Sequence, residues 1–196
     1  MVKVKICGLT RAEDIDAVNS VLPDYIGFVF APSRRRIDRK TAAMLKERLD
    51  PRIKAVGVFV NQDFSFITGL KGIIDIAQLH GDEDGGFIRR VGEVFPVIKA
   101  VGVGEALPVL PEEPDYLIFD SPHGGSGKCF DWTLLKGVNS PYFLAGGLNR
   151  ENVSGAIKML GPFCVDVSGG VETDGFKDVE KIEKFVKIVR GERIDG

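Results

Sequence analysis

The sequence predicts an α/β protein that folds as a closed (β/α)8 TIM barrel of minimal length. Short apolar, β-branched runs recur with successive starts 19 to 29 residues apart, and most are followed by polar or glycine-rich residues and then a helix-like segment. Repeated strand-helix units form a parallel sheet with right-handed crossovers, and eight of them favour closure. The eight predicted strands cover residues 2–6, 25–30, 54–60, 74–78, 97–101, 116–120, 142–145 and 163–167.

An open, doubly wound sheet is the alternative to a barrel. It should carry a glycine-rich phosphate fingerprint, but the run Gly102-Val103-Gly104 continues to Leu107 where a third small residue is required. Eight units within 196 residues leave about 24 residues for each unit. We therefore expect residues 1–196 to form a single barrel domain with short connections.

The connections between the strands carry recognisable helix starts. Thr10 and Glu13 match a capping box, which predicts a first helix that runs towards Val21. Prolines between residues 104 and 114 oppose a helix there, and the segments after residues 63, 82 and 131 leave room for only short helices. Further caps are predicted at Asp38, Asn149 and Asp178, for helices over residues 39–49, over residues 150–160 and from residue 179.

The composition argues against several classes of partner. With 26 basic and 28 acidic side chains, the chain has no charge surplus that would draw it onto a nucleic acid or an anionic membrane. No apolar run approaches the length of a membrane span, and the first residues lack the apolar core of a signal peptide. We expect a cytoplasmic protein with a small-molecule partner.

The three cysteines and two histidines predict neither a disulfide scaffold nor a metal centre. Cys7, Cys129 and Cys164 lie far apart in the sequence, without a Cys-x-x-Cys pair. His80 and His123 are too few for a multi-histidine site. We therefore expect no metal.

Two side chains at strand ends are candidates for acid/base catalysis, because functional groups of such barrels lie at the carboxyl ends of the strands. Cys7 ends the first strand, where Lys5 and the following helix would lower the pKa of its thiol; the alternative is a small buried hydrophobe. Asp120 ends the sixth strand, where desolvation would raise its pKa; the alternative is a loop-capping aspartate. His123 is a weaker candidate because it lies in the loop.

Glycines after the last two strands predict a phosphate site, since backbone amides in these loops of a barrel often face an anion. The alternative is a pair of tight turns. The glycine-rich segment 124–128 does not fit a nucleotide-binding loop, because Pro122 and Cys129 occupy the wrong positions, and we expect a flap over the barrel mouth instead. The predicted phosphate-binding residues are Gly146, Gly147, Ser168, Gly169 and Gly170.

A run of three arginines follows the second strand. It is either a solvated basic face or the source of one arginine that pairs with a substrate carboxylate. His80, at the end of the fourth strand, is either a further rim contact or structural.

Over its whole length the sequence resembles the phosphoribosylanthranilate isomerase family of tryptophan biosynthesis. The resemblance implies the Amadori rearrangement of N-(5′-phosphoribosyl)anthranilate to 1-(2-carboxyphenylamino)-1-deoxyribulose 5-phosphate, with no cofactor, by a barrel that is a monomer or a homodimer. It rests on KICGLT at 5–10, GFVF at 27–30 followed by SRRRI, VGVFVN at 56–61, QLHG at 78–81, GGSGKCFDW at 124–132, AGGLNRENV at 145–153 and DVSGGVE at 166–172.

The same resemblance implies a role for each candidate residue. Asp120 matches the general acid and Cys7 the base. Arg35 aligns best with the arginine that holds the anthranilate carboxylate, with Arg34 and Arg36 as alternatives. Asp166 matches a residue near the sugar hydroxyls, His80 a rim contact, and the glycines and Ser168 of the last two loops the phosphate site.

Two other functions compete with this one. The related histidine-pathway isomerase rearranges an aminoimidazole ribotide, and resemblance to it would imply two aspartates where this chain has Cys7 and Asp120. A non-catalytic barrel that binds a phosphate ligand would keep the glycine loops without needing that pair. Nucleic-acid binding through the arginine run lacks surrounding aromatic and basic residues.

Overall fold

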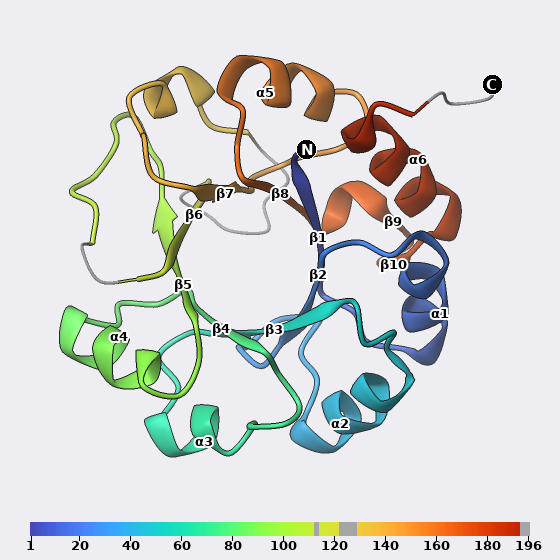
Figure 1. Cartoon of the computed structure of the whole chain (residues 1–196), viewed down its shortest axis with the longest axis vertical. Coiled ribbons are helices and arrows are strands. Elements are labelled where there is room, and N and C mark those ends of the chain that lie inside the picture. Colours follow the sequence, from blue (N-terminus) through green and yellow to red (C-terminus); the bar gives the residue numbers. More distant parts are fainter. Residues whose placement is uncertain (112–113, 122–128, 193–196) are drawn as a thin grey trace.

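Eight parallel strands close into a barrel in which β1 pairs with both β2 and β8, and the helices lie outside the ring of strands (Figure 1). The computed structural model describes residues 1–111, 114–121 and 129–192. The strands are β1 (Lys3–Cys7), β2 (Tyr25–Val29), β3 (Lys54–Phe59), β4 (Ile76–Leu79), β5 (Val97–Gly102), β6 (Tyr116–Asp120), β7 (Tyr142–Leu144) and β8 (Cys164–Val167). The barrel predicted from the sequence is confirmed, strand by strand.

The helices of the outer layer are short, as the length of the chain requires. A two-stranded antiparallel hairpin, β9 (Glu172–Thr173) and β10 (Phe176–Lys177), precedes the last helix. The helices are α1 (Ala12–Val21), α2 (Arg39–Arg48), α3 (Phe64–Thr68), α4 (Gly85–Gly92), α5 (Val153–Leu160) and α6 (Val179–Arg190), with 3-10 turns η1 (Trp132–Leu135) and η2 (Gly169–Val171).

Two of the predicted caps are present. The Asp38 carboxylate accepts from the Thr41 amide at 2.7 Å and starts α2, and the Asp178 carboxylate accepts from the Lys181 amide at 3.1 Å and starts α6. Each bond satisfies an amide that has no partner within its helix.

Two other helix starts were predicted wrongly. In α1 the side chain that reaches back is the buried Asp14, whose Oδ2 accepts from the amides of Thr10 and Arg11, so the cap falls one residue later than the Thr10–Glu13 box implied. The Asn149 side chain accepts from the amides of residues 151 and 152 and forms a turn, and α5 begins only at Val153. Several polar side chains compete for the same free amides at such points.

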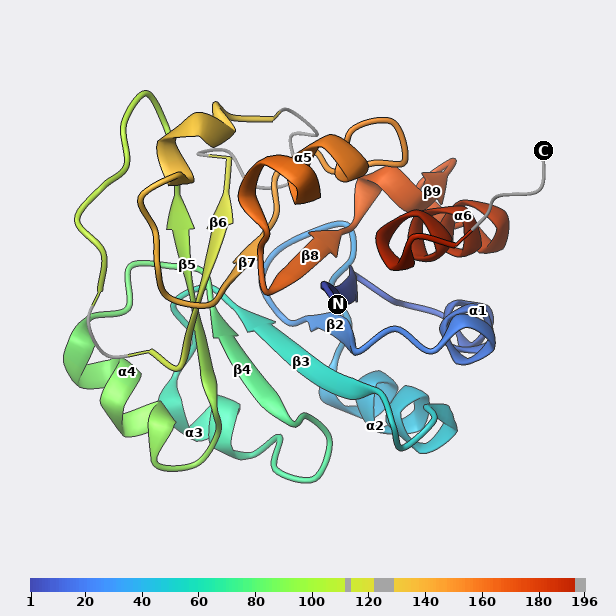
Figure 2. The same ribbon diagram turned by 45° about the horizontal axis from the view of Figure 1, so that its top comes forward.

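The segment between β5 and β6 contains no helix in its described part, as its prolines predict. Figures 1 and 2 show it as an irregular trace on the outside of the barrel, where the neighbouring units carry a helix. The helices after residues 63, 82 and 131 are short, as expected: α3 has 5 residues, α4 has 8 and η1 has 4.

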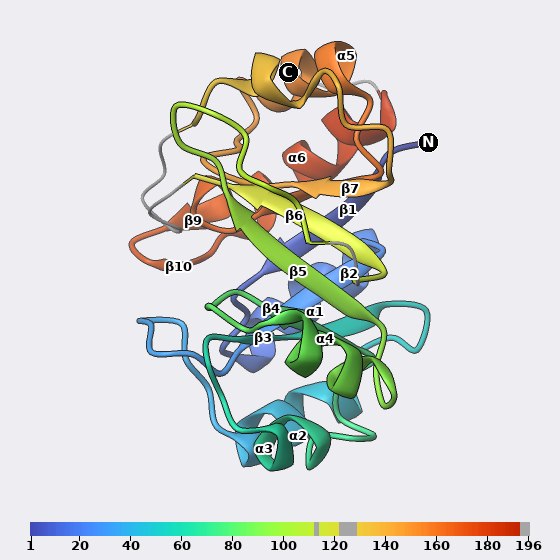
Figure 3. The ribbon, with the colours of Figure 1, turned by 90° about the vertical axis from the view of Figure 1, so that its left-hand side faces the viewer.

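Alternation along the strands separates an apolar layer from a polar barrel mouth. Val4 and Ile6 of β1 pack into the main core under the helices, whereas Lys5 is fully buried inside the barrel. A second apolar cluster, built around Ile98, Ile118 and Phe143, fills the amino-terminal half of the barrel interior. The carboxyl-terminal half carries the polar groups together with a small apolar cluster of Val29, Ala31 and Val58. Figure 3 places the β9–β10 hairpin and the first residue at opposite ends of the barrel.

Among the described residues no helix combines the length and the apolar character needed to cross a membrane.

Candidate active site

Two adjoining cavities open at the carboxyl ends of the strands. The larger, of about 560 Å³, is lined mainly by residues at the ends of β1 to β6 and in the segments that follow them, and the smaller, of about 270 Å³, lies between the loops after β7 and β8. Asp120, Asp166 and Ser168 line both cavities, so these residues stand where the two meet. The site can therefore receive a ligand with two unlike ends.

Cys7 ends β1 and faces the larger cavity, as expected from the alternation of β1. Gly27 stands opposite it on β2, and a Cβ at this glycine would lie 2.6 Å from Sγ, so the thiol occupies space that only glycine leaves open. Lys5 is the preceding inward-facing residue of β1, and its Nζ is 3.0 Å from Asp166 Oδ1.

The expectation that Lys5 lowers the pKa of the Cys7 thiol below its usual value is wrong for the free site. Burial, and to a smaller extent the Asp166 carboxylate, raise the pKa of the thiol, and together they exceed the opposing effects of the Lys5 and Lys177 ammonium groups. Without these two cations the pKa of the thiol would be higher still.

Asp120 ends β6 and carries a carboxyl group suited to holding a proton. Burial raises its pKa, while His80 and the Ser121 amide, which donates to Oδ1 at 2.7 Å, act in the opposite direction. His80 Nε2 lies 3.8 Å from Asp120 Oδ2, and burial lowers the pKa of this imidazole. The directions of both shifts favour a protonated carboxyl group beside a neutral imidazole.

Gln78 is a site residue that the sequence did not single out. It is buried in β4 and faces the larger cavity, and its Nε2 lies 3.3 Å from His80 Nδ1. Its Oε1 is buried without a hydrogen-bond partner among the described residues. A buried amide oxygen of this kind is available to a donor on a ligand.

Of the three arginines after β2, the structure brings one into the site. Arg35 lines the larger cavity and its side chain is 13 % exposed, whereas that of Arg34 is 61 % exposed. Arg36 is exposed and, in the described part of the chain, lines neither cavity. Arg35 is therefore the arginine of this run that is placed to meet a ligand in the larger cavity.

Two further charged residues, Glu172 and Lys177, support this part of the site. The Glu172 carboxylate accepts from Arg35 Nε at 2.6 Å and from its Nη2 at 2.9 Å. Lys177 Nζ donates to Glu172 at 2.7 Å and to the Ser168 carbonyl at 3.1 Å. Glu172 lay within the DVSGGVE motif without an assigned role, and no sequence signal marked Lys177, because the β9–β10 hairpin decides its place.

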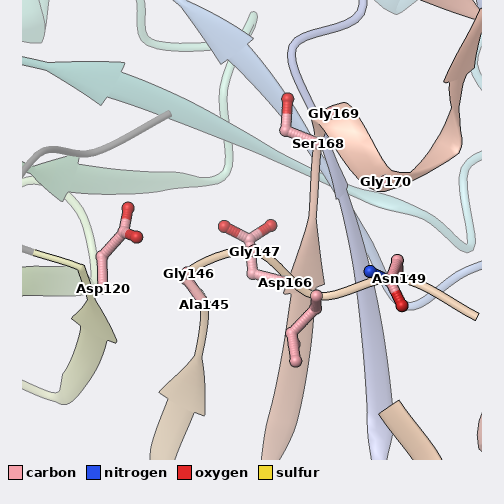
Figure 4. Close-up of a pocket in the computed structure, with 10 residues that line it drawn as sticks. Asp120, Ala145, Gly146, Gly147, Asn149, Asp166, Ser168, Gly169 and Gly170 are labelled. Atoms are coloured by element: carbon pink, nitrogen blue, oxygen red, sulfur yellow. The ribbon is translucent and has the colours of Figure 1, made fainter. Parts of the chain in front are cut away.

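The smaller cavity is lined by the glycine loops predicted to bind phosphate, and Figure 4 shows the two loops facing each other beside Asp120 and Asp166. Gly146 has a φ of +85°, which other residues rarely adopt. A Cβ on Gly170 would lie 2.0 Å from the Leu148 carbonyl oxygen, so only glycine lets the two loops approach this closely.

Gly170→Ala should therefore disturb the smaller cavity, because one of the two loops must move by about 1 Å to restore a normal contact. We expect kcat/KM for a phosphorylated substrate to fall by about 10- to 100-fold, mostly through KM, and inhibition by inorganic phosphate to weaken. Gly155→Ala in α5 is the matched control, since nothing lies within 4 Å of its added methyl group. Equal effects of the two substitutions would contradict the tight-approach argument.

Two expectations fall on residues outside the described ranges: the flap formed by residues 124–128 and the competing acid His123. Within the described ranges, no group of three or more histidine, cysteine or acidic side chains is arranged to hold a metal ion.

A closed barrel with paired glycine loops after β7 and β8, and with a carboxyl group and a thiol at one mouth, has the architecture typical of (β/α)8 barrel enzymes that bind phosphorylated substrates. Comparison with known proteins makes the assignment specific. Residues 4–188 match the family model described as N-(5'phosphoribosyl)anthranilate (PRA) isomerase, and the chain belongs to this family.

Individual relatives agree with the family model. The chain is 50 % identical to an N-(5'-phosphoribosyl)anthranilate isomerase of Endomicrobium trichonymphae, over 97 % of this chain and 99 % of the relative. It is 47 % identical to the enzyme of that name from Clostridium acetobutylicum, over 97 % of this chain and 98 % of the relative. The function expected from the sequence, an isomerase of tryptophan biosynthesis, is confirmed.

Solved structures support the same fold. Phosphoribosyl anthranilate isomerase from Thermus thermophilus superposes with a TM-score of 0.89 at 33 % identity, covering 97 % of this chain and 99 % of that one. A further isomerase structure, with a TM-score of 0.84 at 35 % identity over 97 % and 100 %, is a complex with reduced 1-(o-carboxyphenylamino)-1-deoxyribulose 5-phosphate. A Thermotoga maritima relative, with a TM-score of 0.83 at 35 % identity over 97 % and 100 %, is described as monomers made from a dimeric isomerase.

Proposed function

We propose that this chain converts N-(5′-phosphoribosyl)anthranilate to 1-(2-carboxyphenylamino)-1-deoxyribulose 5-phosphate with Asp120 as general acid and Cys7 as general base. One observation carries the proposal: the carboxyl group and the thiol, from opposite sides of the barrel, line one cavity that adjoins the glycine loops. A substrate anchored by its phosphate would place its ribose between them.

The reaction needs one proton delivered and one removed. Asp120 protonates the furanose ring oxygen, and the ring opens to a Schiff base between C1′ and the anthranilate nitrogen. The Cys7 thiolate then removes the proton from C2′, and the resulting enolamine tautomerises to the ketone. The raised pKa of Asp120 supports its starting role as a proton donor, because burial keeps the carboxyl group neutral at higher pH.

The remaining groups bind and orient the substrate. Arg35, which lines the larger cavity, pairs with the anthranilate carboxylate, and His80 contacts the substrate at the rim. Asp166, held by Lys5 where the two cavities meet, accepts from ribose hydroxyls. The phosphate lies against Gly146, Gly147, Ser168, Gly169 and Gly170.

The relative solved with a reduced carboxyphenylamino-deoxyribulose phosphate supports this substrate class. We propose that residues 1–196 act as one catalytic domain in the cytoplasm, as a monomer or a homodimer, with a phosphorylated small molecule as the partner and neither a nucleic acid nor a membrane.

The test is to mix the protein with N-(5′-phosphoribosyl)anthranilate and follow the loss of anthranilate-type fluorescence. We expect a decay whose rate is proportional to protein concentration, and no turnover of the aminoimidazole ribotide of the histidine pathway. A decay no faster than the uncatalysed background would favour the non-catalytic barrel, and equal turnover of both ribotides would contradict the predicted specificity.

A further inference from the structure

We propose that Glu172 and Lys177 of the β9–β10 hairpin are positioning residues that hold the carboxylate-binding Arg35 and the base Cys7 in one connected cluster. This inference rests on the proposed function, because it takes Arg35 and Cys7 in the roles given above. Through this cluster, the arginine that recognises the aromatic acid and the cysteine that acts as base are held by the same two residues.

The register of the hairpin creates the central ion pair. Lys177 is the cross-strand partner of Glu172, and the turn between the strands has two residues with positive φ, Asp174 at 51° and Gly175 at 84°. Such turns are typical of two-residue hairpin loops and fix which residues stand opposite each other. The Arg11 guanidinium, 4.2 Å from the Phe176 ring centroid, attaches the hairpin to the start of α1.

Glu172 determines which edge of Arg35 is offered to a ligand. Its two oxygens take the Nε and Nη2 side of the guanidinium, in a bidentate geometry that fixes the plane of the group. The end of the guanidinium formed by Nη1 and Nη2 still has three N–H donors for a substrate carboxylate. Without Glu172, the long arginine side chain would have to be ordered by the substrate itself.

Lys177 joins this arginine to the base. Its side chain is 1 % exposed, and Nζ donates to Glu172 and to both the carbonyl and the hydroxyl oxygen of Ser168. The Ser168 hydroxyl in turn donates to the Cys7 carbonyl at 2.9 Å. One buried ammonium group thus fixes the carboxylate that holds Arg35 and the serine that holds Cys7.

The cluster also sets the charge around the thiol. Four charged groups act on Cys7 or are acted on by it: Lys5 beneath it on β1, Asp166 on β8, Lys177 on β10 and Arg35 after β2. Lys5 and Asp166 form one neutral pair, whereas Glu172 pairs with Arg34, Arg35 and Lys177, and these four groups carry two net positive charges. This remaining charge stabilises the Cys7 thiolate, and Lys177 lowers the pKa that burial raises.

The first experiment removes the charge of Glu172. For Glu172→Gln we expect KM for N-(5′-phosphoribosyl)anthranilate to rise about 10-fold, with kcat within about threefold, because the arginine is less well ordered before binding. The corresponding aniline adduct, which lacks the carboxylate, should show an unchanged KM. In an Arg35→Met background, Glu172→Gln should add no further loss.

Glu180→Gln in α6 is the matched control, since this glutamate pairs with Lys184 on an exposed surface. Equal KM changes for the two adducts, or additive losses in the Arg35→Met background, would overturn the role of Glu172. If the wild-type protein turned over neither adduct, the proposed function would fail, but the second experiment would still test the cluster.

The second experiment needs no turnover. The rate of Cys7 alkylation by iodoacetamide is measured against pH in a Cys129→Ser background, because Cys129 is exposed and Cys164 is fully buried. Lys177→Gln should move the alkylation profile to higher pH and slow alkylation several-fold at about pH 8, since one cation near the thiolate is lost. Lys184→Gln, which removes an exposed lysine of α6, is the control.

Lys177→Arg keeps the positive charge and should restore most of the wild-type alkylation profile, which separates the electrostatic effect from a general loosening of the fold. An unchanged profile in Lys177→Gln, or an equal shift in Lys177→Arg, would overturn the role of Lys177. Circular dichroism melting of each variant identifies one that is unfolded, and Lys177→Arg then serves as the deciding variant.

Discussion

Asp120→Asn should lower kcat by about 10²- to 10⁴-fold, because the amide cannot deliver a proton to the ring oxygen while its shape and burial match those of the carboxyl group. KM should change little, since the phosphate and carboxylate ends of the substrate bind elsewhere. The measurement is the initial rate of fluorescence loss at saturating substrate, together with the melting temperature. A kcat near that of the wild type would remove Asp120 from the role of acid.

Asp174→Asn is the matched control for this substitution. Asp174 is exposed in the hairpin turn with a φ of 51°, a conformation that asparagine adopts readily, so neither activity nor stability should change. An unchanged kcat in Asp174→Asn would show that the loss in Asp120→Asn comes from position 120 and not from the replacement of an aspartate as such.

Asp120→Asn should also change the pH dependence of kcat/KM. The wild type needs Asp120 protonated and Cys7 deprotonated, so its rate should rise from low pH as the thiolate forms and fall at high pH as the acid is lost. Burial raises the pKa of both groups, which places the profile on the alkaline side of their ordinary values. In Asp120→Asn the residual rate should rise through the thiol pKa and then stay level.

Cys7→Ser should also lower kcat by about 10²- to 10⁴-fold, because a serine hydroxyl ionises far less readily than a thiol and cannot serve as the base at C2′. Serine fits the space beside Gly27, so the melting temperature should stay close to that of the wild type. Steady-state rates and thermal melts check both statements.

Cys129→Ser is the control for the loss of a thiol. Cys129 is exposed and lines neither cavity among the described residues. Its thiol donates to the Gly147 carbonyl and accepts from Asn152 Nδ2, and a serine hydroxyl can form the same two bonds, so its replacement should leave kcat unchanged. If Cys7→Ser kept wild-type turnover, the base would have to be another group of the larger cavity, and His80 is the first to test.

Strands and some helix starts were predictable because their causes are local. Strands of a parallel barrel are buried on both faces and read as short apolar runs, which marked most of the eight, whereas β1 alternates between apolar and polar residues. The starts of α2 and α6 follow from one aspartate and an amide three residues later. The start of α1 was missed because Asp14 accepts from the amides of Thr10 and Arg11, and the start of α5 because Asn149 and Asn152 close a turn before the helix begins.

By itself the sequence determined the barrel and placed the glycine loops, Cys7 and Asp120 at one mouth, because strand ends meet there whatever the loops between them do. Only the tertiary structure brought Arg35 of the three arginines into the larger cavity, assembled Glu172 with Lys177, and left the buried Gln78 Oε1 without a hydrogen-bond partner among the described residues. It also decided the direction of the Cys7 pKa shift, which depends on burial and on charges from other strands. Such effects act through space between residues as far apart in the chain as Lys5 and Asp166, and no local pattern records them.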